Sequence, residues 1–328
     1  MPAMFAGSAI VSLCVAWCAV RLLLGRYRSL VLDQPNERSL HEGPVPRTGG
    51  IAVLLGAATS LGFGAAQLWL PMVIALGLAA VSFVDDVRGM PTTLRLVVHL
   101  AASAALAWYV LSPMNLLSMA ILILAVAWIT NLYNFMDGSD GLAGGMAVAG
   151  FGAYAIAAWL SGHAPLASLC IALCGASAAF LMHNLHPARI FLGDVGSIAL
   201  GFLAGSLGLV GWRDDVWPLW FPVLVFGPFI GDATVTLAKR LLRGDRVWQA
   251  HREHYYQRMV RMGLGHRRTA WIGYGGMILC AVAALLARNQ PAAIQAAVFA
   301  GVSVLLGIGA VWIDVRWARF ARQTEGVA

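Results

Sequence analysis

Long apolar stretches, separated by short polar segments, fill almost the whole chain of 328 residues. Such stretches predict α-helices that cross a bilayer, because each crossing needs about 20 predominantly apolar residues. We place eleven of them at about 4–24, 49–69, 71–84, 96–112, 116–136, 141–160, 165–182, 197–212, 217–240, 269–287 and 292–314. No repeat of fixed period and no linker between soluble domains interrupts the series. The pattern therefore predicts an all-α, polytopic membrane protein with about 11 transmembrane helices, built as a single integral-membrane domain over residues 1–328.

The composition agrees with this pattern and excludes a soluble domain. Hydrophobic residues make up 60% of the chain, charged residues make up 11%, and the mean hydropathy is +0.76. The five cysteines lie in apolar stretches without metal-ligand partners, so we interpret them as small packing residues. A formal net charge of +7 would suggest nucleic acid in a soluble protein. In a membrane protein the placement of the charges matters more, and we predict membrane lipids but no nucleic acid as partners.

The basic residues orient the predicted spans. If the N-terminus lies outside, eleven spans leave the C-terminus in the cytoplasm, and only Arg213 and Arg288 lie on the outer side. The other 20 of the 22 Lys and Arg residues then lie in or beside cytoplasmic loops, as the positive-inside rule requires. No basic residue precedes the first apolar stretch, which indicates an uncleaved first span rather than a secretory signal.

Acidic residues gather on the same predicted side of the membrane. Five carboxylates lie at the ends of predicted spans: Asp85, Asp86, Asp137, Asp140 and Asp194. Carboxylates at one depth predict a cleft that faces the cytoplasm. The alternative is a transporter or lipid flippase, which would place its ionisable groups near the membrane midplane. Only Asp232 has such a position, and a structural pairing with a neighbouring helix is an alternative to catalysis there.

The segment Asn131–Gly145, NLYNFMDGSDGLAGG, carries the densest polar pattern. Asp137 and Asp140 are three residues apart, which on a helix places them on one face. The glycines beside them allow a ligand or another backbone to approach closely. Carboxylates buried near a bilayer need compensation by a cation, a ligand or water. The alternative is a helix end with polar caps.

Two other segments offer ligands for phosphate chemistry. The adjacent carboxylates of Asp85 and Asp86 suit Mg²⁺, which takes one or two carboxylates together with phosphate oxygens. In HNLHPARIFLGDVGS, Asn184 can hydrogen-bond a ligand, Phe191 offers a flat face for stacking, and Asp194 lies in a glycine-rich turn.

The last predicted cytoplasmic loop is rich in Arg, His and Tyr, and it includes His254 and Arg258. Such a surface suits a diphosphate or a lipid phosphate, although the positive-inside rule alone also explains much of its charge. Carboxylates, a cation and arginines on one membrane face together predict phosphoryl transfer between a cytosolic donor and a membrane-embedded acceptor.

Six motifs in a fixed order resemble one known family. They are DxPNxRxxH (Asp33–His41), PxxGG (Pro46–Gly50), the pair Asp85–Asp86, NxxNxxDGxDGL (Asn131–Leu142), Asn184 ten residues before the aspartate of FxGDxGS, and the His-rich last loop. From about Asp33 to Arg268 the chain resembles the polyprenyl-phosphate N-acetylhexosamine-1-phosphate transferases, that is, glycosyltransferase family 4 in the superfamily of phospho-MurNAc-pentapeptide translocase. The HREHYYQRM stretch looks like the subgroup that starts O-antigen synthesis with UDP-N-acetylfucosamine or UDP-N-acetylglucosamine.

The resemblance implies an enzyme of the bacterial inner membrane that uses Mg²⁺, with Mn²⁺ as an alternative. It would transfer an N-acetylhexosamine 1-phosphate from a UDP-sugar to undecaprenyl phosphate and release UMP, which initiates O-antigen or related cell-surface glycan synthesis. The catalytic residues would be Asp85, Asp86 and Asp194, of which Asp86 and Asp194 would also hold the metal. The substrate site would consist of Asn131, Asn134, Asp137, Asp140, Asn184, Phe191, His254 and Arg258. A homodimer and a catalytically inactive scaffold are open alternatives.

The last loop departs from the family pattern HxHH, which here becomes His254-Tyr255-Tyr256-Gln257. Only the first histidine is kept, so any contact made by Tyr256 or Gln257 must be neutral. We then expect His254, Arg252 and Arg258 to carry positive charge toward the donor's diphosphate. The alternative is that the tyrosines are interfacial aromatics and Arg258 is only a topology signal.

Overall fold

The computed structural model describes residues 2–33, 43–111, 114–249 and 251–325, and its secondary structure is almost entirely helical. The long helices are α1 (Pro2–Gly25), α3 (Trp69–Arg88), α4 (Thr92–Leu111), α5 (Leu116–Phe135), α6 (Leu142–Leu160), α7 (Ala164–Asn184), α8 (Gly193–Arg213), α12 (Gly265–Ala287) and α13 (Ala292–Glu325). The shorter helices are α2 (Gly49–Ala58), α9 (Trp220–Val225), α10 (Gly227–Leu242) and α11 (Tyr255–Met259). The remaining elements are η1 (Thr59–Phe63), η2 (Ala66–Leu68), η3 (Val260–Leu264) and an antiparallel pair of two-residue strands, β1 (Leu32–Asp33) and β2 (Val45–Pro46). The all-α prediction is confirmed.

Nine helices among the described residues are long and apolar enough to cross a membrane, and they match nine of the eleven predicted spans. The other two predicted spans, 49–69 and 217–240, are helical but broken. In the first, α2 continues into η1 and ends at Gly64, whose φ is +93°. In the second, Pro228 in the first turn of α10 separates this helix from α9. A proline is tolerated in a first turn but cannot donate the hydrogen bond that would continue the preceding helix.

Helix α8 forms the centre of the bundle and is buried along almost its whole length. Small residues let neighbouring helices approach it closely. A Cβ atom on Gly201 would lie 2.7 Å from the Cβ of Tyr133 and 2.8 Å from the carbonyl oxygen of Ile129, both on α5. Helix α3 packs on α8 as well. Because α8 begins where α3 and α5 end, this packing brings Asp194 to the ends of those two helices.

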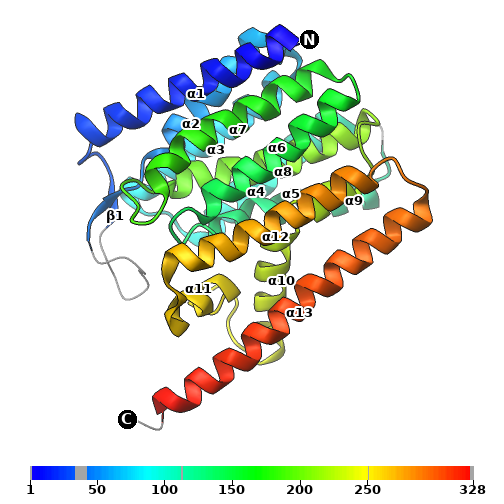
Figure 1. The fold of residues 1–328 in the computed structure, drawn as a ribbon. Coiled ribbons are helices and arrows are strands. Elements are labelled where there is room, and N and C mark those ends of the chain that lie inside the picture. Colours follow the sequence, from blue (N-terminus) through cyan, green and yellow to red (C-terminus); the bar gives the residue numbers. More distant parts are fainter. Residues whose placement is uncertain (1, 34–42, 112–113, 250, 326–328) are drawn as a thin grey trace.

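Helix α13 lies apart from this centre (Figure 1). It crosses the molecule diagonally, it contacts α10, α11 and α12, and few of its residues are buried. The N-terminus and the C-terminus lie at opposite ends of the molecule (Figure 1).

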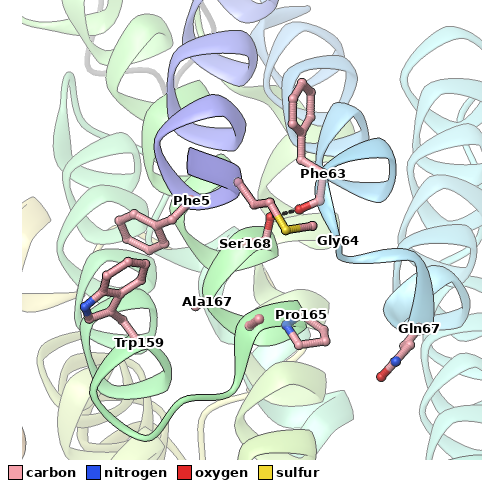
Figure 2. Close-up of a pocket in the computed structure, with 10 residues that line it drawn as sticks. Phe5, Phe63, Gly64, Gln67, Trp159, Pro165, Ala167 and Ser168 are labelled. Atoms are coloured by element: carbon pink, nitrogen blue, oxygen red, sulfur yellow. Dashed lines mark hydrogen bonds between the residues drawn. The ribbon is translucent and has the colours of Figure 1, made fainter. Parts of the chain in front are cut away.

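A small cavity of about 280 Å³ lies where α1 begins and where α6 passes into α7 (Figure 2). Phe5, Phe63 and Trp159 line it, and the hydroxyl group of Ser168 donates a hydrogen bond to the carbonyl oxygen of Phe63 at 2.6 Å. None of its lining residues in the described part of the chain is charged. The cavity lies at the end of the bundle opposite to Asp194, so we do not regard it as the site of phosphate chemistry.

Candidate active site

Two glycine-rich segments join by backbone hydrogen bonds to form the floor of the site. The amide of Phe191 donates to the carbonyl oxygen of Pro46 at 2.7 Å, and the amides of Gly49 and Gly50 donate to Phe191 and Leu192 at 2.9 and 2.8 Å. A Cβ atom on Gly50 would lie only 2.2 Å from the backbone nitrogen of Gly196, so the two backbones touch. The PxxGG and FxGDxGS motifs therefore form one structural unit. Between them they position Arg47 and Asp194.

Five carboxylates surround two arginines at this end of the bundle. We call this group the aspartate cluster, and it consists of Asp33, Asp85, Asp86, Asp137 and Asp194 with Arg47 and Arg95. Arg95 Nη1 lies 3.1 Å from Asp85 Oδ2 and 3.6 Å from Asp194 Oδ2. Arg47 Nη1 lies 3.5 Å from Asp86 Oδ1 and 3.9 Å from Asp33 Oδ1. The predicted catalytic residues Asp85, Asp86 and Asp194 are therefore brought together from α3 and α8.

The charges of the aspartate cluster do not balance. If all groups were ionised, five carboxylates and two guanidinium groups would leave a formal charge of −3. The Asp86 side chain is only 4% exposed, and its Oδ2 atom has no hydrogen-bond partner among the described residues. Burial, and then the charge of Asp194, raise the pKa of the Asp137 carboxyl well above its ordinary value. An excess of buried negative charge favours a cation or a proton at this position.

Asn134 and Asn131 extend the site along α5. The Asn134 side chain bonds to Asp194 and accepts a hydrogen bond from the Ser197 hydroxyl group at 2.9 Å. Asn131 lies one turn earlier and donates to the carbonyl oxygen of Ala127 at 2.7 Å. Its Oδ1 atom lies 3.1 Å from His99 Nδ1, so the imidazole must donate there. Asn134 thus contacts the aspartate cluster directly, whereas Asn131 is held from α4.

Asp137 and Asp140 do not share a helix face, so this prediction is wrong. Helix α5 ends at Phe135, α6 begins at Leu142, and Gly141 between them has a φ of +77°. The glycines break the helix that the sequence spacing assumed. As a result, Asp137 points into the aspartate cluster and Asp140 points to a separate group.

Asp140 and Asn184 hold the loop after α7. Asp140 Oδ2 lies 2.6 Å from His186 Nδ1 and accepts the backbone N–H of Ala188 at 3.2 Å. Asn184 accepts the backbone N–H of Gly141 and donates to the carbonyl oxygen of Ile190, both at 2.9 Å. Both side chains are buried and engaged within the protein. Their expected contact with the substrate stays a prediction, as does stacking by the half-buried Phe191.

The last loop folds around Asp232. This carboxylate accepts the backbone N–H groups of Tyr255 and Tyr256 at 2.9 and 3.1 Å, and it lies 3.2 Å from His254 Nδ1. Gln257 accepts the backbone N–H of His254 at 3.2 Å, which closes the first turn of α11. Asp232 thus makes the pairing with a neighbouring helix that was one of its two alternatives, and its role in stability or catalysis stays a prediction. His254 is oriented by this carboxylate, and its contact with the donor stays a prediction.

Arg258 is buried and directed away from the aspartate cluster. Its Nη1 atom donates to Asp314 Oδ1 on α13 at 2.9 Å, and its Nη2 atom lies 3.8 Å from Glu253. A direct contact between Arg258 and the donor's diphosphate would require these ion pairs to open, so this role also stays a prediction. Of the first motif only Asp33 can be compared, because residues 34–41 lie outside the described part of the chain.

The structure adds site residues that the motifs did not single out. Arg47 and Arg95 offset part of the negative charge of the aspartate cluster, and His99 orients Asn131. Arg95 and His99 are four residues apart on α4, a spacing that places them on one helix face. The ten-residue separation of Asp85 from Arg95, across the turn between α3 and α4, is a further signal in the sequence.

Comparisons with known proteins identify the family of the chain. The family model described as glycosyl transferase family 4 matches residues 68–212, which carry four of the five clustered aspartates. The chain is 30% identical over 308 residues to decaprenyl-phosphate N-acetylglucosaminephosphotransferase of Mycobacterium tuberculosis, covering 78% of this chain and 74% of that protein. It is 27% identical over 283 residues to the "Probable undecaprenyl-phosphate N-acetylglucosaminyl 1-phosphate transferase" of Bacillus subtilis, covering 79% and 77%. A phospho-N-acetylmuramoyl-pentapeptide-transferase of Shouchella clausii is 29% identical over 249 residues, covering 66% and 75%. With this coverage and identity, the chain belongs to glycosyl transferase family 4.

Proposed function

We propose that this protein transfers an N-acetylhexosamine 1-phosphate from a UDP-sugar to undecaprenyl phosphate or a similar polyprenyl phosphate, with release of UMP. The aspartate cluster carries the proposal, because it gathers carboxylates and arginines at the ends of apolar membrane helices. Such a cluster suits a diphosphate bound together with a cation, beside the lipid that anchors the acceptor. The names of two relatives, which specify N-acetylglucosamine phosphate transfer and a polyprenyl phosphate, support the same reaction.

The cation that fits the site is Mg²⁺, with Mn²⁺ as an alternative. Asp86 Oδ2 is buried without a partner, and excess negative charge surrounds it. No three His, Cys, Asp or Glu side chains among the described residues form a complete metal site. Mg²⁺ takes only one or two carboxylates and completes its shell with phosphate oxygens and water. Asp86 and Asp194 would hold the ion, which would neutralise the donor's diphosphate.

The other groups of the aspartate cluster would position the substrates. Arg95 lies between Asp85 and Asp194, where its guanidinium group can also bind a phosphate oxygen. In the transfer, an oxygen of the lipid phosphate attacks the donor's β-phosphorus. The bond from that phosphorus to the bridging oxygen breaks, and UMP leaves with the electron pair. Asp85 would orient the acceptor phosphate or take its last proton. The alternative is a two-step route, in which Asp85 attacks the β-phosphorus and expels UMP, and the lipid phosphate then displaces Asp85.

We place the site on the cytoplasmic side of a bacterial inner membrane, in the first step of O-antigen or related glycan synthesis. The distribution of basic residues supports this orientation. Of the two arginines expected outside, Arg213 is the last residue of α8 and Arg288 follows α12, both at helix ends that lie away from the aspartate cluster. A flippase is disfavoured, because Asp232, the acid expected near the midplane, is bound by α11.

A direct assay tests the proposed function. Purified protein would be incubated with Mg²⁺, undecaprenyl phosphate and each of several UDP-N-acetylhexosamines, and the lipid product would be identified by mass. We expect one donor to give a lipid diphosphate sugar and an equal amount of UMP. Asp194→Asn serves as the inactive control. The proposal fails if folded wild-type protein forms no lipid-linked sugar with any donor.

A further inference from the structure

Asp314 on α13 gathers three donors from α10 and the α11 segment. Its carboxylate accepts hydrogen bonds from Arg258 Nη1 at 2.9 Å and from the Tyr255 hydroxyl group at 3.3 Å, and it pairs with Lys239 on α10. We call these four residues the Asp314 ion cluster. It joins the outermost helix to the short helix α11. Asp314 lies beyond residues 68–212, which the family model matches.

Helix α11 has only five residues, so it depends on neighbours for its position. Asp232 binds the backbone at its start, and the Asp314 ion cluster binds two of its side chains. Its opposite side carries Tyr256, which is 3% exposed. The Tyr256 hydroxyl group donates to the carbonyl oxygen of Phe135 at 3.0 Å. A Cβ atom on Gly138 would lie 2.3 Å from that hydroxyl oxygen. Helix α11 is thus wedged between α13 and the turn 135–138, which carries Asp137.

If Asp314 lost its charge, no other carboxylate among the residues that the structure describes could readily take its place beside Arg258. Arg258 is buried, and its other carboxylate, Glu253, lies 3.8 Å away and is already paired with Arg240 and Arg243. Without the charge of Asp314, Lys239 and Arg258 would repel each other, and a buried guanidinium group would be left without its close partner. A shift of α11 would reduce this repulsion. Because Tyr256 contacts the turn 135–138, the turn that carries Asp137 would then move as well.

We propose that Asp314 is a positioning residue for the transfer reaction, acting through α11 and Tyr256 on Asp137. The inference rests on the proposed function for its kinetic consequence, but the mechanical coupling can be tested without it. A shift of about 1 Å in a reacting group can cost about 100-fold in rate. The effect should therefore fall mainly on kcat rather than on the KM of the donor.

A double-mutant cycle tests the coupling. Asp314→Asn and Tyr256→Phe would be made singly and together, with Asp214→Asn as the matched control. Asp214 also pairs with an arginine and a histidine, but at the opposite end of α8. We expect Asp314→Asn to lower kcat at least about tenfold with little change in KM. The double variant should be much less impaired than the product of the single effects, whereas Asp214→Asn should combine with Tyr256→Phe additively.

Hydrogen–deuterium exchange gives a readout that does not depend on activity. Asp314→Asn should speed exchange in residues 255–262 and also in residues 135–141, but not in residues 160–168 at the other end of the bundle. Asp314→Glu, which keeps the charge, should restore most of the protection. The inference is overturned if Asp314→Asn leaves exchange in residues 135–141 unchanged. It is also overturned if the effects of Asp314→Asn and Tyr256→Phe on kcat simply multiply in the double variant. If the wild-type protein forms no lipid-linked sugar, the proposed function fails while the exchange result still decides the coupling.

Discussion

Arg47 binds the side chain and the backbone of Asp86 at once. Its Nη1 atom lies 3.5 Å from the Asp86 carboxylate, and its Nη2 atom donates to the Asp86 carbonyl oxygen at 3.2 Å. A lysine is a point charge and cannot reproduce this two-pronged contact. We expect Arg47→Lys to lower kcat/KM about tenfold or more, the scale of a lost charge-assisted contact. The control is Arg88→Lys, at the exposed end of α3, the helix that carries Asp86. Equal activities of the two variants would contradict the role of Arg47.

Removal of one carboxylate at a time tests the proposed cation site. We expect Asp86→Asn and Asp194→Asn each to lower turnover by at least about 100-fold, because an amide cannot replace a negative charge beside a cation and a diphosphate. Asp245→Asn, at an exposed ion pair with Arg243, is the control for expression and insertion. A variant with near-normal turnover at saturating Mg²⁺ would remove that residue from the metal site.

The raised pKa of Asp137 makes stability depend on pH. The unfolded chain has an aspartate pKa of about 4, whereas burial and Asp194 hold the folded value well above it. Between the two values the folded protein binds more protons, so its stability falls as the pH rises. We expect the thermal midpoint in EDTA to fall as the pH rises above about 4, and Mg²⁺ to oppose this fall. Asp137→Asn should flatten the dependence, and a wild-type midpoint that rose with pH would refute the assignment.

Asp232 is expected to matter for stability at least as much as for transfer. Its carboxylate accepts two backbone N–H groups and pairs with His254, and an amide offers one accepting oxygen instead of two. Asp232→Asn should lower the free energy of unfolding by about 1–3 kcal/mol, measured by thermal unfolding in detergent against Asp245→Asn. Unchanged stability together with lost transfer would instead assign Asp232 to catalysis.

Cysteine labelling tests the orientation. In a variant without native cysteines, Arg246→Cys, on the same side as the aspartate cluster, should react with an impermeant reagent only after the membrane is opened. Asn289→Cys, which follows α12, should react in intact cells. The reverse pattern would place the proposed site outside and exclude a cytosolic donor.

The sequence predicted the helices from the length of the apolar stretches. It also predicted which helix ends carry the acidic residues, from the position of each motif between those stretches. It could not predict how Asp137 and Asp140 diverge, since their separation depends on a φ of +77° at Gly141. Nor could spacing show that Arg258 pairs with Asp314, because the two residues are 56 positions apart and meet only through the packing of α13. Tyr256 and Gln257 stand where the family pattern has histidines. Tyr256 donates a hydrogen bond to the carbonyl oxygen of Phe135, and Gln257 accepts one from the backbone of His254.

The length of α13 has a consequence for where the Asp314 ion cluster lies. Its 34 residues span about 51 Å at 1.5 Å per residue, whereas the hydrocarbon layer is about 30 Å thick. The apolar part before Asp314 accounts for about 33 Å, so Asp314 falls near the boundary between acyl chains and headgroups. At that depth a lipid phosphate can reach Lys239, whose side chain is 40% exposed, whereas Arg258 is buried. We therefore expect the bilayer's content of anionic lipid to influence the pair between Lys239 and Asp314.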